Sequence, residues 1–146
     1  MAHLSVSERI DAPVERVFAV ATDLPTAAER IDGIDKIELL TDGPVGVGTR
    51  WKETRGKSGT ETLEVSAFDP PNGYTVSCDS CGCHFDSRFR FEPLEGGGTR
   101  ATLDVTTTAE SLMAKLMAPL TRLMMGGMEK AVAQDLADIK RAAEAG

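Results

Sequence analysis

Three cysteines and a histidine lie close together near the middle of the chain, where they are candidates for binding a metal ion. Cys78, Cys81 and Cys83 are followed directly by His84, and thiolate and imidazole groups are the ligands of tetrahedral zinc sites. Cys83 and His84 begin a strand-like segment, so their side chains point to opposite faces and cannot both reach one ion. Since the remaining histidine, His3, is distant in sequence, we expect no metal site.

The same cysteines raise the question of a disulfide. A cross-strand bond between Cys78 and Cys83 is compatible with a hairpin, but a reducing cytoplasm disfavours it. The N-terminal residues Met1–Leu4 lack the basic segment and apolar core of a signal peptide. We therefore expect a cytoplasmic protein with reduced thiols in the hairpin.

Residues suited to acid–base or nucleophilic catalysis are few. A Ser–His–Asp triad needs a positioned histidine, and neither His3 nor His84 is expected on an apolar face. Glu53 and Ser87 are the polar exceptions on strand faces that are otherwise apolar. An apolar setting raises the pKa of a carboxyl group, which makes Glu53 the one candidate acid. We assign no catalytic residue and expect no cofactor.

Composition limits the kinds of partner that the protein has. Its 146 residues suit one domain, spanning 1–146. The net charge of −7 repels phosphate backbones, so nucleic acid is not an expected partner. No run of 18 or more apolar residues is present, so we expect no integral membrane association. Either a monomer or a homodimer is compatible with the sequence.

The elements that must position these side chains begin with a strand and two helices. Leu4–Ile10 alternates as a strand does, and Pro13 suits the first position of an amphipathic helix over residues 12–22. A short second helix is expected over 26–31. Six further strands follow, joined by hairpin-length turns, so the pairing is antiparallel. They cover residues 37–40, 49–55, 60–68, 74–78, 83–91 and 99–107.

The last third of the chain predicts one long helix over residues 119–145, preceded by a break at Ala118-Pro119. The segment that leads into it and its first turns are rich in methionine, an adaptable side chain that suits a deformable wall. Gly126-Gly127 is costly in a helix and suggests a close approach of the backbone to the sheet or to a ligand. The methionines are Met113, Met117, Met124, Met125 and Met128.

A curved sheet that wraps around one long helix leaves a hollow between them, and apolar strand positions mark its concave side. In the fourth strand, for example, Leu63, Val65 and Ala67 alternate with polar residues. We expect a ligand pocket there, with ordinary core packing as the alternative for each residue. The predicted strand residues are Trp51, Glu53, Leu63, Val65, Val76, Phe85, Ser87, Phe89, Leu103 and Val105. The predicted helix residues are Leu116, Leu120, Leu123, Met124 and Gly127.

The order and spacing of five motifs resemble the START-like, helix-grip superfamily, in particular its bacterial polyketide cyclase/dehydrase and lipid-transport type. The resemblance covers nearly the whole chain. It implies an α+β fold in which a curved antiparallel sheet of about seven strands wraps around a long C-terminal helix, and a ligand held between them without a cofactor. The motifs are Ile10–Phe18 with Asp23, Gly43–Trp51, Asp69–Pro71, Gly97–Arg100 and Asp135–Lys140.

The function that we expect is the binding, and possible transport or presentation, of a small hydrophobic molecule such as a lipid, an isoprenoid or a polyketide-like compound. One alternative is an enzyme of the cyclase or aromatase type, moving protons with Glu53 or with an arginine of a strand. A regulatory or stress-associated interaction protein is a further alternative. Changing Glu53 to Gln separates the first two, because an enzyme loses turnover while a binding protein keeps its affinity.

Overall fold

A computed structural model describes residues 2–56, 59–80 and 82–145, with side chains described outside 118–126. Its strands form one antiparallel sheet in the order β1-β7-β6-β5-β4-β3-β2. The strands are β1 (Ala2–Ile10), β2 (Lys36–Leu39), β3 (Arg50–Thr54), β4 (Thr60–Asp69), β5 (Gly73–Ser80), β6 (Cys83–Pro93) and β7 (Thr99–Ala109). The helices are α1 (Val14–Ala21), the short 3-10 helix η1 (Leu24–Thr26), α2 (Ala27–Arg30), α3 (Leu112–Leu116) and α4 (Ala118–Ala145).

The sheet confirms the strands predicted from alternation and turn residues, and corrects one face assignment. The pairing of β4 with β5 shifts between Val65 and Ala67. This irregularity lets Ser66 interrupt the alternation. Ala67 is therefore exposed on the outer face instead of following Val65 onto the concave face, and Phe68 turns inward to contact Phe18. The concave face thus gains an aromatic ring at the end of β4.

Helix α1 buries the apolar stripe that its periodicity predicts. Val14, Val17, Phe18 and Ala21 are all buried, which orients the helix against the sheet. Pro13 occupies the N-cap, with an extended backbone, one position earlier than expected. The predicted second helix is present as η1 followed by α2.

The C-terminal third contains a short helix that the sequence did not separate from the long one. Helix α3 ends at Leu116 and α4 begins at Ala118, so the break falls at Met117. Pro119 then lies in the first turn of α4, where a missing N–H costs nothing. Gly127 is exposed, and an added Cβ there would meet no described atom within 4 Å. Of the two approaches expected at Gly127, the one to the sheet is therefore wrong, and the one to a ligand stays a prediction.

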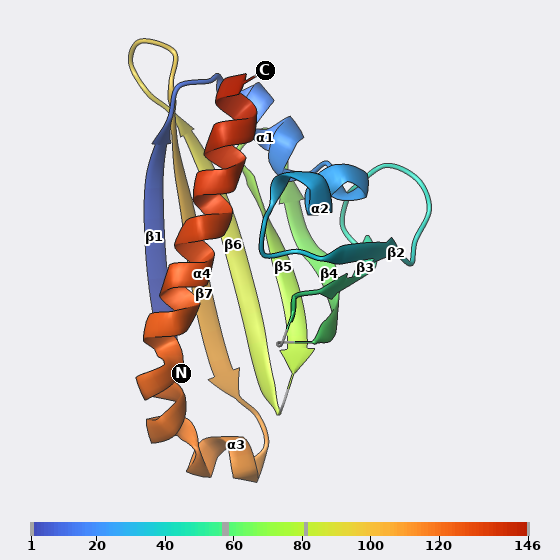
Figure 1. Cartoon of the computed structure of the whole chain (residues 1–146), viewed down its shortest axis with the longest axis vertical. Helices are drawn as coiled ribbons and strands as arrows, with labels where there is room; N and C mark the ends of the chain where they lie inside the picture. Colours follow the sequence, from blue (N-terminus) through green and yellow to red (C-terminus); the bar gives the residue numbers. More distant parts are fainter. Residues whose placement is uncertain (1, 57–58, 81, 146) are drawn as a thin grey trace.

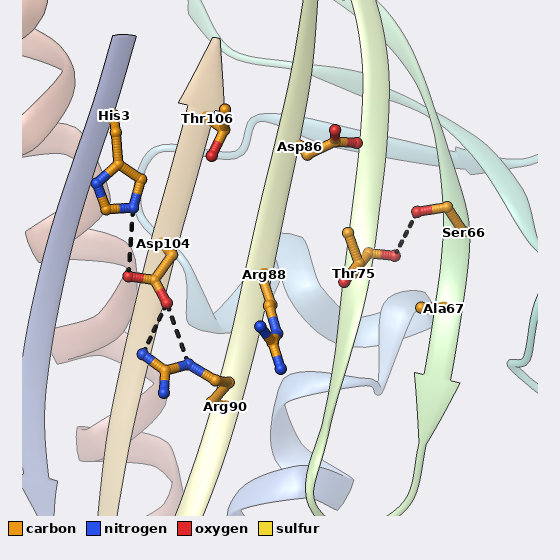
Figure 2. Close-up of a pocket in the computed structure, with 9 residues that line it drawn as sticks. All are labelled: His3, Ser66, Ala67, Thr75, Asp86, Arg88, Arg90, Asp104 and Thr106. Carbon is orange, nitrogen blue, oxygen red and sulfur yellow. Dashed lines mark hydrogen bonds and ion pairs between the residues drawn. The ribbon is translucent and has the colours of Figure 1, made fainter. Parts of the chain in front are cut away.

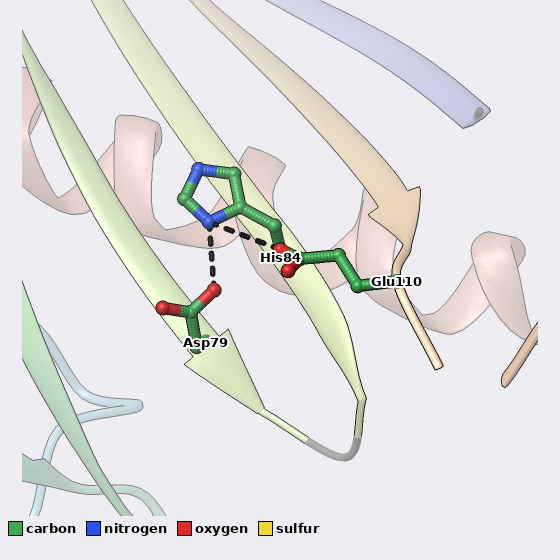
Figure 3. A group of neighbouring side chains, drawn as sticks. All are labelled: Asp79, His84 and Glu110. Atoms are coloured by element: carbon green, nitrogen blue, oxygen red, sulfur yellow. Dashed lines mark hydrogen bonds and ion pairs between the residues drawn. The ribbon is translucent and has the colours of Figure 1, made fainter. Parts of the chain in front are cut away.

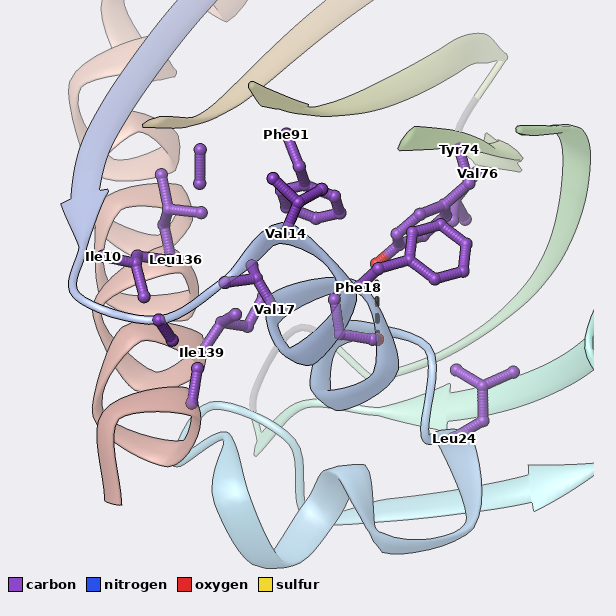
Figure 4. Close-up of a cluster of buried hydrophobic side chains, with 14 of the residues drawn as sticks. Ile10, Val14, Val17, Phe18, Leu24, Tyr74, Val76, Phe91, Leu136 and Ile139 are labelled. Carbon is purple, nitrogen blue, oxygen red and sulfur yellow. Dashed lines mark hydrogen bonds between the residues drawn. The ribbon is translucent and has the colours of Figure 1, made fainter. Parts of the chain in front are cut away.

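Helix α4 lies along β1 and, less extensively, β7, and its C-terminal half contacts α1 (Figure 1). The main core forms where these elements meet (Figure 4). Ile10, Val17, Phe91 and Leu136 are almost completely inaccessible to solvent, and burying each such side chain is worth about 1.5–3 kcal/mol. None of the described helices is both long and apolar enough to cross a membrane.

Candidate functional site

The concave face of the sheet is covered unevenly. Helix α4 packs on β1 and β7. Helix α1 packs on β6, beside the C-terminal half of α4 (Figure 1). Of the predicted pocket residues, those beneath these helices or beside the main core are buried; they are Trp51, Val65, Val76, Leu103 and Val105. The others on the strands are only partly buried; they are Glu53, Leu63, Phe85, Ser87 and Phe89.

Strand register brings the partly buried residues of β6 into one region. Ser87 lies between Val76 of β5 and Val105 of β7. Phe85 lies between Cys78 and Thr107. Phe89 stacks on Tyr74, with ring centroids 4.5 Å apart. Partly buried side chains, two of them aromatic, therefore follow one another along β6, and α3 lies near the end of the sheet at which β6 begins (Figure 1).

The described helix residues that we predicted to line the pocket are exposed to solvent. Leu116 projects from α3 and is 72% exposed, as are its neighbours Leu112 (75%) and Met113 (73%). Gly127 is also exposed. The remaining predictions, Leu120, Leu123 and Met124, lie outside the described side chains. The apolar residues of α3 stand at the open end of the concave face, and only the methionine-rich composition indicated them.

Glu53, the candidate acid, is part of a hydrogen-bonded network. One of its carboxylate oxygens accepts from Trp51 Nε1 at 3.2 Å, and the other accepts from Arg55 Nε at 2.7 Å. The guanidinium of Arg55 also donates to both oxygens of Asp135 on α4, at 3.0 and 2.8 Å. The network joins β3 to α4, and it fixes the orientation of the Glu53 carboxylate through both oxygens.

The ionisation of this network follows from its burial. Burial disfavours the charged form of Arg55, but the hydrogen bonds and charges of Asp135 and Glu53 outweigh it and raise its pKa. Burial raises the pKa of Asp135, with Arg55 opposing the shift. Since a guanidinium does not lose its proton in a protein, Arg55 stays positively charged in its ion pair with Asp135. Burial, followed by the charges of Glu53 and Asp135, also raises the pKa of Tyr74, whose hydroxyl donates to the carbonyl of Ala21.

The cysteines do not form the cross-strand pair considered above. Cys78 lies opposite Phe85 and Cys83 lies opposite Ser80, so the two are offset along the hairpin, and both are free thiols. Burial, with the charges of Glu61, Asp79 and Glu53, raises the pKa of Cys78 to about 11. The Cys78 thiol is therefore protonated at neutral pH. Cys81 lies outside the described residues.

A depression of about 640 Å³ lies on the outer face of the sheet, opposite α4 (Figure 2). Its walls are polar: Asp104 accepts hydrogen bonds from Arg90 and lies 3.7 Å from His3. A second depression, of about 310 Å³, separates the start of α1 from the turns near Pro71 and Pro93. Neither contains any of the residues predicted to line a ligand pocket.

The outer face also carries a group of possible metal ligands that sequence spacing did not suggest. Asp79, His84 and Glu110 place ligand atoms within 4.8 Å of one another (Figure 3). However, His84 Nδ1 is 2.7 Å from Asp79, and Nε2 is 3.1 Å from Asp86. The Asp79 hydrogen bond is the largest influence and raises the pKa of His84. The cluster therefore favours a proton on the imidazole, which competes with a cation.

A curved seven-stranded sheet packed on a long C-terminal helix, with two short helices after its first strand, is the helix-grip architecture of START-like proteins. Over residues 1–144 the sequence matches the family described as polyketide cyclase / dehydrase and lipid transport. The chain belongs to this family. Among curated proteins, none matches it significantly.

Solved structures share the fold at low sequence identity. TTHA0849 from Thermus thermophilus is 21% identical with a TM-score of 0.75, covering 99% of this chain and 98% of its own. The Zhui aromatase/cyclase from Streptomyces sp. R1128 is 18% identical with a TM-score of 0.77, covering 98% and 93%. Ara h 8.0201 is 15% identical with a TM-score of 0.78, covering 99% of both chains. At these identities the likeness establishes the fold alone.

Proposed function

We propose that the protein binds a small hydrophobic molecule on the concave face, between β6 and the helices α3 and α4. The observation that carries the proposal is that Phe85 and Phe89 are only partly buried on this face of the sheet, where the contacts of α4 lie mainly with β1 and β7. Small-molecule sites are mostly apolar with a few polar groups that fix orientation, and Ser87 and Thr107 supply such groups here. Membership of a family that includes lipid transport agrees with this proposal.

The enzymatic alternative receives no specific support from the network around Glu53. Both oxygens of Glu53 accept hydrogen bonds from Trp51 and Arg55, so its described contacts account for it as part of a network between β3 and α4. Binding, with carriage or presentation of the ligand, is therefore the function that we favour.

Titration with Nile red, an uncharged lipophilic dye, tests the proposal. We expect saturable binding at one dye per chain. Changing Phe85 to Gln should weaken it roughly tenfold, because an apolar contact is replaced by an amide. Arg88→Gln is the matched control, since Arg88 is exposed on the outer face of the same strand and should not change the affinity. Unsaturable binding, or equal effects of the two variants, would contradict the proposal.

A further inference from the structure

One buried hydroxyl on the concave face stands out among the described side chains. Thr107 of β7 is only 4% exposed, and its Oγ1 has no hydrogen-bond partner in the part of the chain that the structure describes. Leaving a buried polar group unpaired costs about 1–3 kcal/mol. A hydroxyl retained at such a position calls for a hydrogen-bond partner beyond the described residues, and a bound molecule is one that would supply it.

Thr107 belongs to a small group of uncharged polar side chains. Phe85 separates it from Cys78 across the sheet, and Ser87 lies diagonally next to it, opposite Val105. The hydroxyl of Ser87 likewise makes no hydrogen bond to any described residue, and the Cys78 thiol keeps its proton because burial raises its pKa to about 11. The group therefore offers neutral donors and acceptors beside an aromatic surface.

The charged side chains of the strands around this group disfavour a negatively charged ligand. On the described strands, register places every lysine, arginine and histidine on the outer face, while Glu53 and Glu61 lie on the concave face. Arg55, which follows β3 on this side, already has its guanidinium held by Glu53 and Asp135, and Lys115 of α3 is exposed. A bound carboxylate would thus lose its hydration and meet two like charges, which is costly.

From this arrangement we infer that the ligand is uncharged and carries an alcohol or ketone oxygen, which Thr107 and Ser87 hydrogen-bond while its apolar part lies on Phe85 and Phe89. The inference rests on the proposed binding function and adds the chemical class of the ligand. It separates neutral lipophilic alcohols and ketones from free fatty acids of the same length.

Calorimetric titration of the full chain with decanol and decanoate at neutral pH tests the inference, since the two probes differ only in the head group. We expect decanol to bind at least tenfold more tightly. Thr107→Val should weaken decanol roughly fivefold, the loss of one hydrogen bond. Thr106→Val, its neighbour in the outer-face depression, should leave the affinity unchanged.

A second readout needs no ligand. Because Thr107→Val replaces an unpaired buried hydroxyl by a methyl group of similar size, the unliganded variant should melt at or above the temperature of the wild type. A lower melting temperature, or equal binding of decanol and decanoate, would overturn the inference. If Nile red saturates the protein but decanol does not bind, the inference fails and the proposed function stands. If neither binds, the proposed function itself fails.

Discussion

Removing the guanidinium of Arg55, which directly follows β3, should destabilise the protein far more than removing an exposed arginine of β3. Arg55→Met leaves the carboxylates of Glu53 and Asp135 facing each other without a cation. The three side chains are 29%, 12% and 18% exposed for Arg55, Glu53 and Asp135. Breaking a fully buried pair costs about 3–5 kcal/mol. With this residual exposure to solvent, we expect a loss of about 2–3 kcal/mol in the free energy of unfolding.

Urea unfolding followed by the fluorescence of Trp51 measures this loss, because the chain has one tryptophan and its indole donates to Glu53. Arg50→Met is the control. Arg50 contacts Glu64 at 3.4 Å, but their side chains are 52% and 51% exposed, so the change should cost less than about 0.5 kcal/mol.

The loss should also depend on pH. Burial raises the pKa of Asp135, so its folded state holds a proton more tightly than its unfolded state does. Without Arg55 this carboxylate disfavours folding at neutral pH, and the penalty is relieved as pH falls through the raised pKa of Asp135. The gap between wild type and Arg55→Met should therefore narrow in acid. Equal losses for the Arg55 and Arg50 variants at all pH values would show that the ion pair of Arg55 and Asp135 does not stabilise the fold.

Three further predictions concern the core and the hairpin. Leu136→Ala should cost about 2–5 kcal/mol in thermal or urea unfolding, since Leu136 is fully buried; a loss below about 1 kcal/mol would contradict the packing of α4. Cys78 should react with iodoacetamide more slowly than cysteine in an unfolded control at pH 8, as its pKa is about 11; peptide mapping by mass spectrometry measures this, and equal rates would contradict its burial. His84 should titrate above its ordinary pKa in an NMR experiment, because Asp79 accepts its hydrogen bond. Because the pKa of His84 is higher in the folded state than in the unfolded state, protonated His84 stabilises the fold at any pH below its unfolded-state pKa. This stabilisation is lost as the pH rises through its folded-state pKa. A stability difference between wild type and His84→Gln that persisted at alkaline pH would contradict this assignment.

The sheet could be predicted from the sequence because its signals are local. Turn residues such as Asp69-Pro70-Pro71 and Gly96-Gly97-Gly98 separate alternating segments, and antiparallel hairpins follow from short connections. The irregularity at Ser66 was missed because an inserted residue changes the face of everything after it without altering the composition. The break before α4 was placed close to its position because proline marks it.

The site could be predicted only in part, because its decisive contacts join distant segments. Alternation placed Phe85, Ser87 and Phe89 on one face. The bond between Arg55 and Asp135 spans 80 residues of sequence, and nothing local indicates which acid of the long helix meets that arginine. The unpaired state of the Thr107 hydroxyl likewise depends on every neighbour in space.

The most direct test of the account is to observe where a bound ligand lies. Intermolecular nuclear Overhauser effects between decanol and the isotope-labelled protein report its neighbours within a few ångströms. We expect contacts from the alkyl chain to the rings of Phe85 and Phe89, which lie on the concave face. Contacts instead to Arg88 and Arg90, in the depression on the outer face, would contradict it.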